Sequence, residues 1–311
     1  MKDKILITDT LFIMPEHEQM IREAGFDIER LETATATEDQ LIEHLQDKVG
    51  YILGGIEQVT DKVIESATNL KAIVFTGAGW KSYIPSHELA TSKGIAIANT
   101  PKANTYAVAE YTLALILTMT RNLMELGRTG KTKFQTTSSL NELTVGIIGM
   151  GSIGSEVANM LNGLGVKKIW YYSPNRKDDI EQQTGAEFVD MDILLTESDI
   201  VTLHASQEAG NGFMGQAELA KMKDGALLIN CGFTGGIDAD ALYAELSSGR
   251  LRATQDDPID ERFDSLPLSV WFNSNSHTAY NTFEANKTAS DMATRSLLNL
   301  LATGDDTNKV N

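Results

Sequence analysis

The sequence predicts an α/β protein with two lobes, each a parallel sheet covered by helices on both faces. Short apolar stretches of four or five residues alternate with longer amphipathic stretches, and this alternation begins near residue 5 and again near residue 143. Strands that alternate with helical stretches are typical of parallel sheets with helical layers. The chain also has 311 residues, more than a single core usually holds, which favours two domains.

The expected elements form two series. The first holds strands at residues 5–8, 49–53, 72–75 and 95–98, with helical stretches at 16–24 and 64–69. The second holds strands at 144–148, 168–172, 188–189, 200–203 and 226–230, and a last helix at 282–302 closes it. Between them a single helix is expected at 106–128, with Thr105 as a candidate cap. This helix is apolar on more than one face, so we expect it to be buried between domains or at the contact of a homodimer.

The composition disfavours several classes of protein. Lys and Arg total 26 against 43 Asp and Glu, and a net charge of −17 is poorly suited to nucleic acid or anionic membrane surfaces. Cys231 is the only cysteine, so no disulfide can form within the chain, which fits a reducing compartment. The apolar start is interrupted at Asp9, unlike a signal peptide, and the apolar stretch at 113–117 is too short to span a bilayer. A cytoplasmic protein without a metal site is expected.

A glycine-rich turn indicates a dinucleotide site. The buried-strand pattern at 144–148 runs directly into Gly149-Met150-Gly151-Ser152-Ile153-Gly154, and a helical pattern follows. In such a turn the first glycine permits the tight bend, the second lets the backbone approach a pyrophosphate, and the third lets helix and strand pack closely. The start of the helix offers N–H groups and partial positive charge to the phosphates. The strand before and the helix after make the motif far more specific than the glycines alone.

The residue that usually binds the adenosine ribose is an acid at the end of the next strand. Here that position holds Ser173, followed by Asn175 and Arg176. A carboxylate would repel a 2′-phosphate, whereas a serine with a nearby arginine can receive one. We therefore expect NADP to be preferred over NAD; the alternative is that Arg176 belongs to a solvated loop.

Further motifs occur in a fixed order along nearly the whole chain. They are Gly77-Ala78-Gly79, Asn99-Thr100-Pro101 with Val108-Ala109-Glu110, the glycine turn, the segment 198–204 ending in His204, the segment 222–230, and Ser276-His277-Thr278-Ala279. In this order they resemble the D-isomer-specific 2-hydroxyacid dehydrogenase family, which uses NAD or NADP.

The resemblance implies two flavodoxin-like lobes, with the cofactor lobe inserted into the substrate lobe. It places the substrate lobe at residues 1–99 and 283–311 and the cofactor lobe at 100–282, with the active site in the cleft between them. It assigns substrate binding to the glycine loop Gly77-Ala78-Gly79, and we add Trp80 and Lys81, which follow this loop directly, as candidate substrate residues. It adds to the cofactor site residues beyond the glycine turn and the ribose loop, namely His204, Cys231, Gly232 and Asp256.

The resemblance also implies the acid–base chemistry. His277 matches the family's proton donor, which gives a proton to the carbonyl oxygen as hydride arrives and takes it back in reverse. Glu261 lies five residues after Asp256, the family's spacing for the carboxylate that orients this histidine and favours its protonated form. His204 is expected to form part of the cofactor wall and not to donate the proton.

One position departs from the family. The expected substrate-binding arginine after Asn230 is replaced by Phe233, and no Arg or Lys lies at 231–238. An arginine fork would hold the substrate carboxylate by paired charge-assisted bonds. Three explanations are open. Lys81 supplies the missing positive charge, or Phe233 and Trp80 form an aromatic pocket for a less acidic substrate. In the third, catalysis is lost while cofactor binding remains.

Two functions follow from these alternatives. The first is hydride transfer between a nicotinamide cofactor and a 2-keto or 2-hydroxy acid, or a related carbonyl compound. The second is a catalytically impaired dinucleotide-binding sensor or interaction protein.

Overall fold

The computed structural model describes residues 2–9, 11–129, 136–274 and 278–311. The chain folds as two compact units, Met1–Asn104 with Asn281–Asn311, and Thr105–Tyr280. The boundaries expected from the sequence were 99/100 and 282/283. Both units are α/β with parallel sheets, as the sequence predicts.

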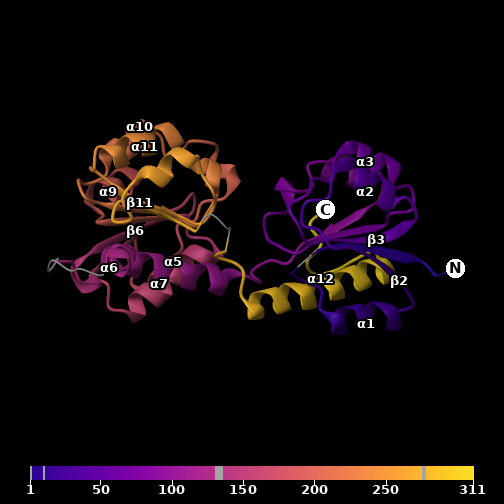
Figure 1. Ribbon diagram of the computed structural model, residues 1–311. Coiled ribbons are helices and arrows are strands. Elements are labelled where there is room, and N and C mark those ends of the chain that lie inside the picture. Colours follow the sequence, from indigo (N-terminus) through magenta and orange to yellow (C-terminus); the bar gives the residue numbers. More distant parts are fainter. Residues whose placement is uncertain (1, 10, 130–135, 275–277) are drawn as a thin grey trace. The chain divides into compact units, whose positions relative to one another are not determined.

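The first unit has a five-stranded parallel sheet in the order β2-β1-β3-β4-β5. The strands are β1 (Lys4–Thr8), β2 (Asp27–Leu31), β3 (Lys48–Leu53), β4 (Ala72–Phe75) and β5 (Ala96–Ala98). The helices are α1 (Pro15–Glu23), α2 (Glu38–Leu45), α3 (Asp61–Ser66), α4 (His87–Ser92) and α12 (Phe283–Thr303), with one 3-10 turn, η1 (Trp80–Ser82). Helices α1 and α12 cover one face, and α2 and α3 cover the other (Figure 1).

The second unit has a seven-stranded parallel sheet in the order β12-β11-β10-β9-β6-β7-β8. The strands are β6 (Thr144–Ile148), β7 (Lys168–Tyr172), β8 (Glu187–Phe188), β9 (Ile200–Leu203), β10 (Leu227–Asn230), β11 (Arg252–Gln255) and β12 (Trp271–Asn273). The helices are α5 (Thr105–Thr120), α6 (Leu123–Thr129), α7 (Ser152–Gly163), α8 (Asp178–Thr184), α9 (Met191–Glu197), α10 (Gln216–Lys221) and α11 (Ala239–Ser247). Short 3-10 turns are η2 (Leu140–Glu142), η3 (Gln207–Ala209), η4 (Thr234–Gly236) and η5 (Glu261–Ser265).

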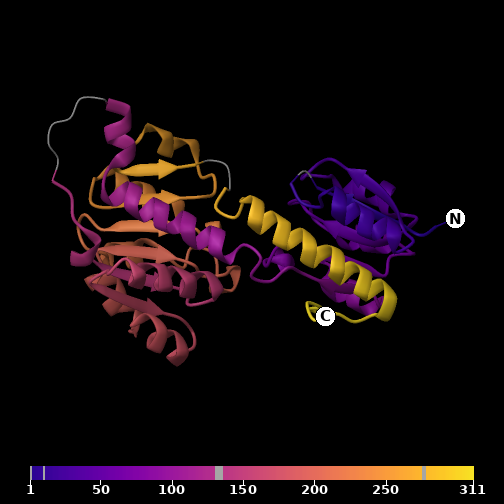
Figure 2. The same cartoon turned by 90° about the horizontal axis from the view of Figure 1, so that it is seen from below.

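Two apolar cores sandwich this sheet. On one face, Ile116 of α5 and Leu161 of α7 pack against strand residues such as Ile147. The long helix α5 and its neighbour α7 lie along this face (Figure 2). On the other face, Leu219 of α10 and Leu242 of α11 belong to a second core. This burial explains the apolar residues of α5 that face the sheet, such as Leu115, Ile116 and Met119.

The prediction of a single helix at 106–128 is wrong. The structure has two helices there, α5 and α6, and Asn122 between them has a φ of 51°. Asparagine is one of the residues that tolerate this left-handed conformation, so it ends one helix and turns the chain into the next. Among the described residues, no helix has the length and apolar character needed to cross a membrane.

Candidate active site

The glycine turn joins β6 to α7 as the sequence predicts. Gly149 has a φ of 98°, and a Cβ there would lie 2.7 Å from the backbone nitrogen of Ala205. A Cβ on Gly154 would lie 2.1 Å from the carbonyl oxygen of Gly149. A Cβ on Gly151, the residue before α7, would meet nothing within 4 Å. The first and third glycines are therefore required by the fold, whereas the second leaves open space at the start of a helix, where an anion binds well.

A cavity of about 530 Å³ opens beside this turn. It lies at the carboxyl ends of β6, β7 and β9, and its lining includes Gly149, Gly151, Ser173, Asn175 and His204. Neighbouring parallel strands end at the same edge of a sheet, and ligands of such folds bind there. Among the described residues that line the cavity, none is acidic and Lys177 is basic. The cavity therefore suits a negatively charged ligand.

The loop after β7 holds the residues expected at the ribose. Ser173 is buried, and its hydroxyl donates to the carbonyl oxygen of Asn175. Arg176 does not line the cavity; its Nε and Nη2 bond the Glu181 carboxylate at 2.9 and 2.6 Å, and its Nε lies 3.1 Å from Asp178. The guanidinium is thus engaged by two carboxylates, with which a 2′-phosphate would have to compete.

His204 follows β9 and lines the same cavity. Its Nε2 lies 3.0 Å from the Thr202 hydroxyl, and its buried Nδ1 has no hydrogen-bond partner within the described part of the chain. Burial lowers the pKa of His204 to about 3, so the ring is neutral at physiological pH. A neutral ring with one unpartnered nitrogen fits a residue of the cofactor wall that bonds a bound ligand.

The loop after β10 contains Cys231, Gly232 and Phe233. Burial raises the pKa of the Cys231 thiol to about 12, so the thiol stays protonated. A Cβ on Gly232 would lie 3.0 Å from the carbonyl oxygen of Ala205, so this backbone packs closely on the loop after β9. The half-buried Phe233 turns its ring over Gly235, where a Cβ would lie 2.6 Å from the ring. The close packing at Gly232 therefore holds the loop after β10 against the loop after β9, at the edge of the sheet where the glycine turn lies.

Asp256 follows β11 and is only 4% exposed. Its carboxylate accepts hydrogen bonds from the backbone N–H groups of Thr278 and Ala279, at 2.9 and 3.0 Å, and from the Ser274 hydroxyl at 3.2 Å. It therefore bonds both ends of the segment that contains His277. From the sequence we expected Asp256 at the cofactor and missed this anchoring role; the polar Ser274 and Thr278 on either side of the histidine were the available signal.

Comparison with known proteins identifies the family. Residues 113–275 match the profile described as D-isomer specific 2-hydroxyacid dehydrogenase, NAD binding domain. A glyoxylate reductase of Thermococcus litoralis is 33% identical over 278 residues, which cover 84% of this chain and 81% of that protein. The chain belongs to the D-isomer specific 2-hydroxyacid dehydrogenase family. Its second unit contains the family's NAD binding domain.

One further relative and one solved structure differ from the glyoxylate reductase in the activity that they are named for. A D-3-phosphoglycerate dehydrogenase of Methanocaldococcus jannaschii is 32% identical over 267 residues, 83% of this chain but 49% of that protein. The chain thus spans about half the length of this relative. A solved structure titled acyclic imino acid reductase (Bsp5), in complex with NADPH and D-Arg, superposes with a TM-score of 0.85 at 25% identity, covering 99% of this chain and 100% of that one.

The substrate loop expected of the family lies in the first unit, directly after β4. The carbonyl oxygen of Gly77 accepts the N–H of Thr100 at 3.2 Å, and that of Ala78 accepts the Asn99 side chain at 3.1 Å. The loop is thus tied to the chain that leaves β5. Trp80 begins η1, and its partly buried side chain packs on the core of this unit.

Other members of the predicted family site are only partly placed. His277 lies outside the described residues, so its pairing with Glu261 stays a prediction. Glu261 is the exposed first residue of η5.

The remaining predicted residues lie beside the two glycine loops. Ser152 and Ile153 form the first turn of α7 beside the open position at Gly151. Lys81 lies next to Trp80, with its Nζ 5.9 Å from the ring centroid. Within the described ranges, no cluster of three or more His, Cys, Asp or Glu side chains could hold a metal ion.

Proposed function

We propose that this chain is a nicotinamide-dependent oxidoreductase that interconverts a 2-keto and a 2-hydroxy acid, or a related carbonyl compound. The observation that carries the proposal is the cavity beside Gly151, where the start of α7 leaves open space for a phosphate group. The chain also belongs to this dehydrogenase family. The Thermococcus litoralis relative is named a glyoxylate reductase, and its length is mostly covered. We propose that residues 1–99 with 283–311 form the substrate domain and 100–282 the cofactor domain.

His277 is the proposed acid–base residue. A reduced nicotinamide, when bound, supplies the hydride that adds to the carbonyl carbon. His277 donates a proton to the carbonyl oxygen, which becomes the hydroxyl, and regains it in the reverse reaction. Asp256 supports this role because its carboxylate bonds the chain on both sides of His277. Glu261 is the proposed partner that favours the protonated imidazole.

The absent arginine decides which substrates are expected. Phe233 offers no charge, so this loop does not hold a substrate carboxylate by a bidentate ion pair. We propose that Trp80 and Lys81 of the loop after β4 supply substrate contacts in its place. A solved neighbour is named an imino acid reductase, so C=N compounds belong with 2-keto acids in the substrate panel.

NADP is the proposed cofactor of preference. Ser173 stands where an acid would repel a 2′-phosphate, and no described residue that lines the cavity is acidic. Lys177 lines the cavity, and the neighbour in complex with NADPH is similar over its whole length. The ion pairs of Arg176 with Asp178 and Glu181 oppose this preference, because a phosphate must displace them. Titration with NADH and NADPH tests the proposal, which equal or tighter NADH binding would overturn.

A homodimer and a cytoplasmic location are also proposed. The second unit exposes apolar side chains on α5 and α6, with Tyr106, Leu117 and Leu123 exposed by 63%, 37% and 52%. Exposed apolar side chains on these two successive helices suit contact with a second copy. Light scattering at micromolar concentration tests the dimer, and a monomer under these conditions would contradict it.

A substrate panel tests the proposed activity. Small 2-keto acids, including glyoxylate, and their imino derivatives are supplied with NADH or NADPH, and loss of the reduced cofactor is followed by absorbance. We expect turnover on at least one of them. Tight cofactor binding without turnover on any would favour the second function, a dinucleotide-binding sensor, for which the substitution at Phe233 is the supporting observation.

A further inference from the structure

A second hollow lies at the opposite edge of the seven-stranded sheet. Four neighbouring strands, β11, β10, β9 and β6, begin beside it, and its lining includes Leu143, Asp199, Ala226 and Arg252 at their amino ends. The cofactor cavity lies at the carboxyl ends of the same sheet, so the two hollows are separated by the length of a strand, roughly 15 Å. The volume of about 330 Å³ is enough for a small metabolite.

The half-buried Arg252 is the main cation of this hollow. Its Nε and Nη1 donate to the carbonyl oxygens of Gly225 and Met119, at 3.4 and 3.2 Å. No carboxylate of the described residues pairs with it, and burial alone lowers its pKa. By contrast, Arg176 and Arg250 each bond a carboxylate. A guanidinium taken partly out of water without a counter-charge costs free energy that a bound anion would recover.

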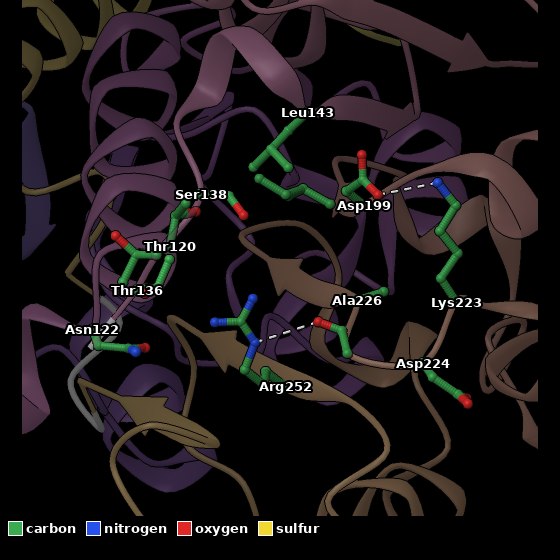
Figure 3. Close-up of a pocket in the computed structure, with 13 residues that line it drawn as sticks. Thr120, Asn122, Thr136, Ser138, Leu143, Asp199, Lys223, Asp224, Ala226 and Arg252 are labelled. Atoms are coloured by element: carbon green, nitrogen blue, oxygen red, sulfur yellow. Dashed lines mark hydrogen bonds and ion pairs between the residues drawn. The ribbon is translucent and has the colours of Figure 1, made fainter. Parts of the chain in front are cut away.

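Hydroxyl groups line the side of the hollow toward which Arg252 points. Thr120, at the end of α5, is 6% exposed, and its Oγ1 is buried without a hydrogen-bond partner in the described part of the chain. Figure 3 shows the guanidinium projecting toward the side on which Thr120, Thr136 and Ser138 lie. An unpartnered buried hydroxyl in a polar hollow is itself unfavourable, and a ligand oxygen would satisfy it.

The acidic residues of the hollow do not oppose an anion. The Asp199 carboxylate is neutralised by Lys223, whose Nζ lies 3.1 Å away, and it also accepts the N–H of Thr144 at 2.8 Å. Asp224 is 90% exposed and lies 3.5 Å from the Arg250 guanidinium. The charge of Arg252 is therefore not balanced by any carboxylate among the described residues, although the net charge of the chain is −17.

We propose that this hollow, the amino-edge pocket, binds a small oxyanion, the carboxylate or phosphate group of a metabolite, on Arg252 and Thr120. The planar guanidinium presents paired N–H donors that match either group, and the hydroxyl supplies a further donor. Because the pocket and the cofactor cavity lie at opposite edges of the sheet, both can be filled at once. The pocket is thus a second ligand site of the cofactor domain, separate from the reaction.

Anion titrations of the full chain test the proposal. Inorganic phosphate and malonate are the probes, titrated at constant ionic strength against chloride, without and with saturating NADH to fill the glycine turn. The melting temperature reports binding. Two variants are compared with the wild type. Arg252→Gln removes the positive charge, and Thr120→Val removes the hydroxyl while keeping the shape of the side chain. The matched control is Lys221→Gln, which removes an exposed cation of the same unit that pairs with Asp192 at 2.7 Å.

We expect a saturable rise in melting temperature with at least one probe, with an apparent Kd below ~10 mM. The Kd should weaken by about tenfold in Arg252→Gln and by about threefold or more in Thr120→Val, and stay unchanged in Lys221→Gln. NADH affinity should be the same in all variants. Saturation by malonate alone identifies a carboxylate ligand, and by phosphate alone a phosphate ligand.

Either of two results would overturn the proposal. One is the absence of a saturable response to both probes beyond that of chloride. The other is binding that both variants retain at the wild-type Kd, which would assign the anion to another site. If Arg252→Gln fails to fold, Thr120→Val decides alone, because a buried valine in place of an unpartnered threonine leaves the packing in place.

Discussion

The three glycines of the turn between β6 and α7 should separate into two classes when each is replaced by alanine. In Gly154→Ala, the new Cβ would lie 2.1 Å from a backbone oxygen that cannot move without its strand. Overpacking of this kind costs about 1–3 kcal/mol. Gly149→Ala adds the strain of a φ of 98° to a contact of 2.7 Å. Both variants should lose stability and cofactor affinity together.

Gly151→Ala should lose cofactor affinity alone. Its φ of −82° suits any residue, and its Cβ would meet nothing within 4 Å, so the free protein has room for it. A bound pyrophosphate would occupy that space. If the clash with the ligand costs about 1–3 kcal/mol, the Kd for NADH and NADPH rises about 5- to 150-fold.

Urea unfolding and fluorescence titration of the reduced cofactor measure the two effects. Gly163→Ala, at the end of α7 with open space around it, is the matched control, and it should bind cofactor normally and gain up to about 1 kcal/mol of stability. Gly151 is not the pyrophosphate position if Gly151→Ala binds both cofactors as the wild type does, or if it is destabilised as much as Gly154→Ala.

Three other predictions concern single side chains. Glu57 lies between β3 and α3 and is 4% exposed, and burial raises its pKa. Its contribution to stability is therefore largest below the unfolded pKa and falls as the pH rises through the folded pKa. Glu57→Gln should therefore gain stability over the wild type as the pH rises above about 4, and a pH-independent difference in urea unfolding would contradict this. Arg176→Gln should raise the Kd for NADPH about tenfold and leave the Kd for NADH unchanged. An equal effect on both Kd values would show that Arg176 does not contact the 2′-phosphate. Phe233→Arg should raise kcat/KM for glyoxylate or pyruvate about tenfold or more, and no gain in a folded, cofactor-binding variant would count against the alignment of that loop.

The parallel sheets were predictable where strands are buried on both faces, because such strands are continuous apolar stretches. Strand β6 and the turn after it are the clearest case. The edge strand β2 was missed because its five residues, Asp27–Leu31, include three charged ones and none is fully buried. Strand β11 was missed although it is mostly buried, because its sequence is Arg-Ala-Thr-Gln. Its place between β10 and β12 comes from tertiary pairing that no local pattern reveals.

The glycine turn, the loop after β7 and His204 line one cavity, but the sequence does not show how the charged side chains near it are paired. Arg176 follows Ser173 in sequence, yet helix α8 places Glu181 and Asp178 within reach of its guanidinium. Asp256 follows β11, and its hydrogen bonds to Thr278 and Ala279 depend on how the loop after β12 returns to β11. Such pairings depend on folded loop geometry, which residue types alone do not specify.

Hydride transfer with His277 as the acid–base residue is the reaction we propose for this chain. The most direct measurement compares kcat of the wild type and His277→Ala on the best substrate of the panel, with the cofactor Kd measured for both. We expect His277→Ala to lose about 100-fold or more in kcat with an unchanged cofactor Kd. A variant that keeps the wild-type kcat would contradict it.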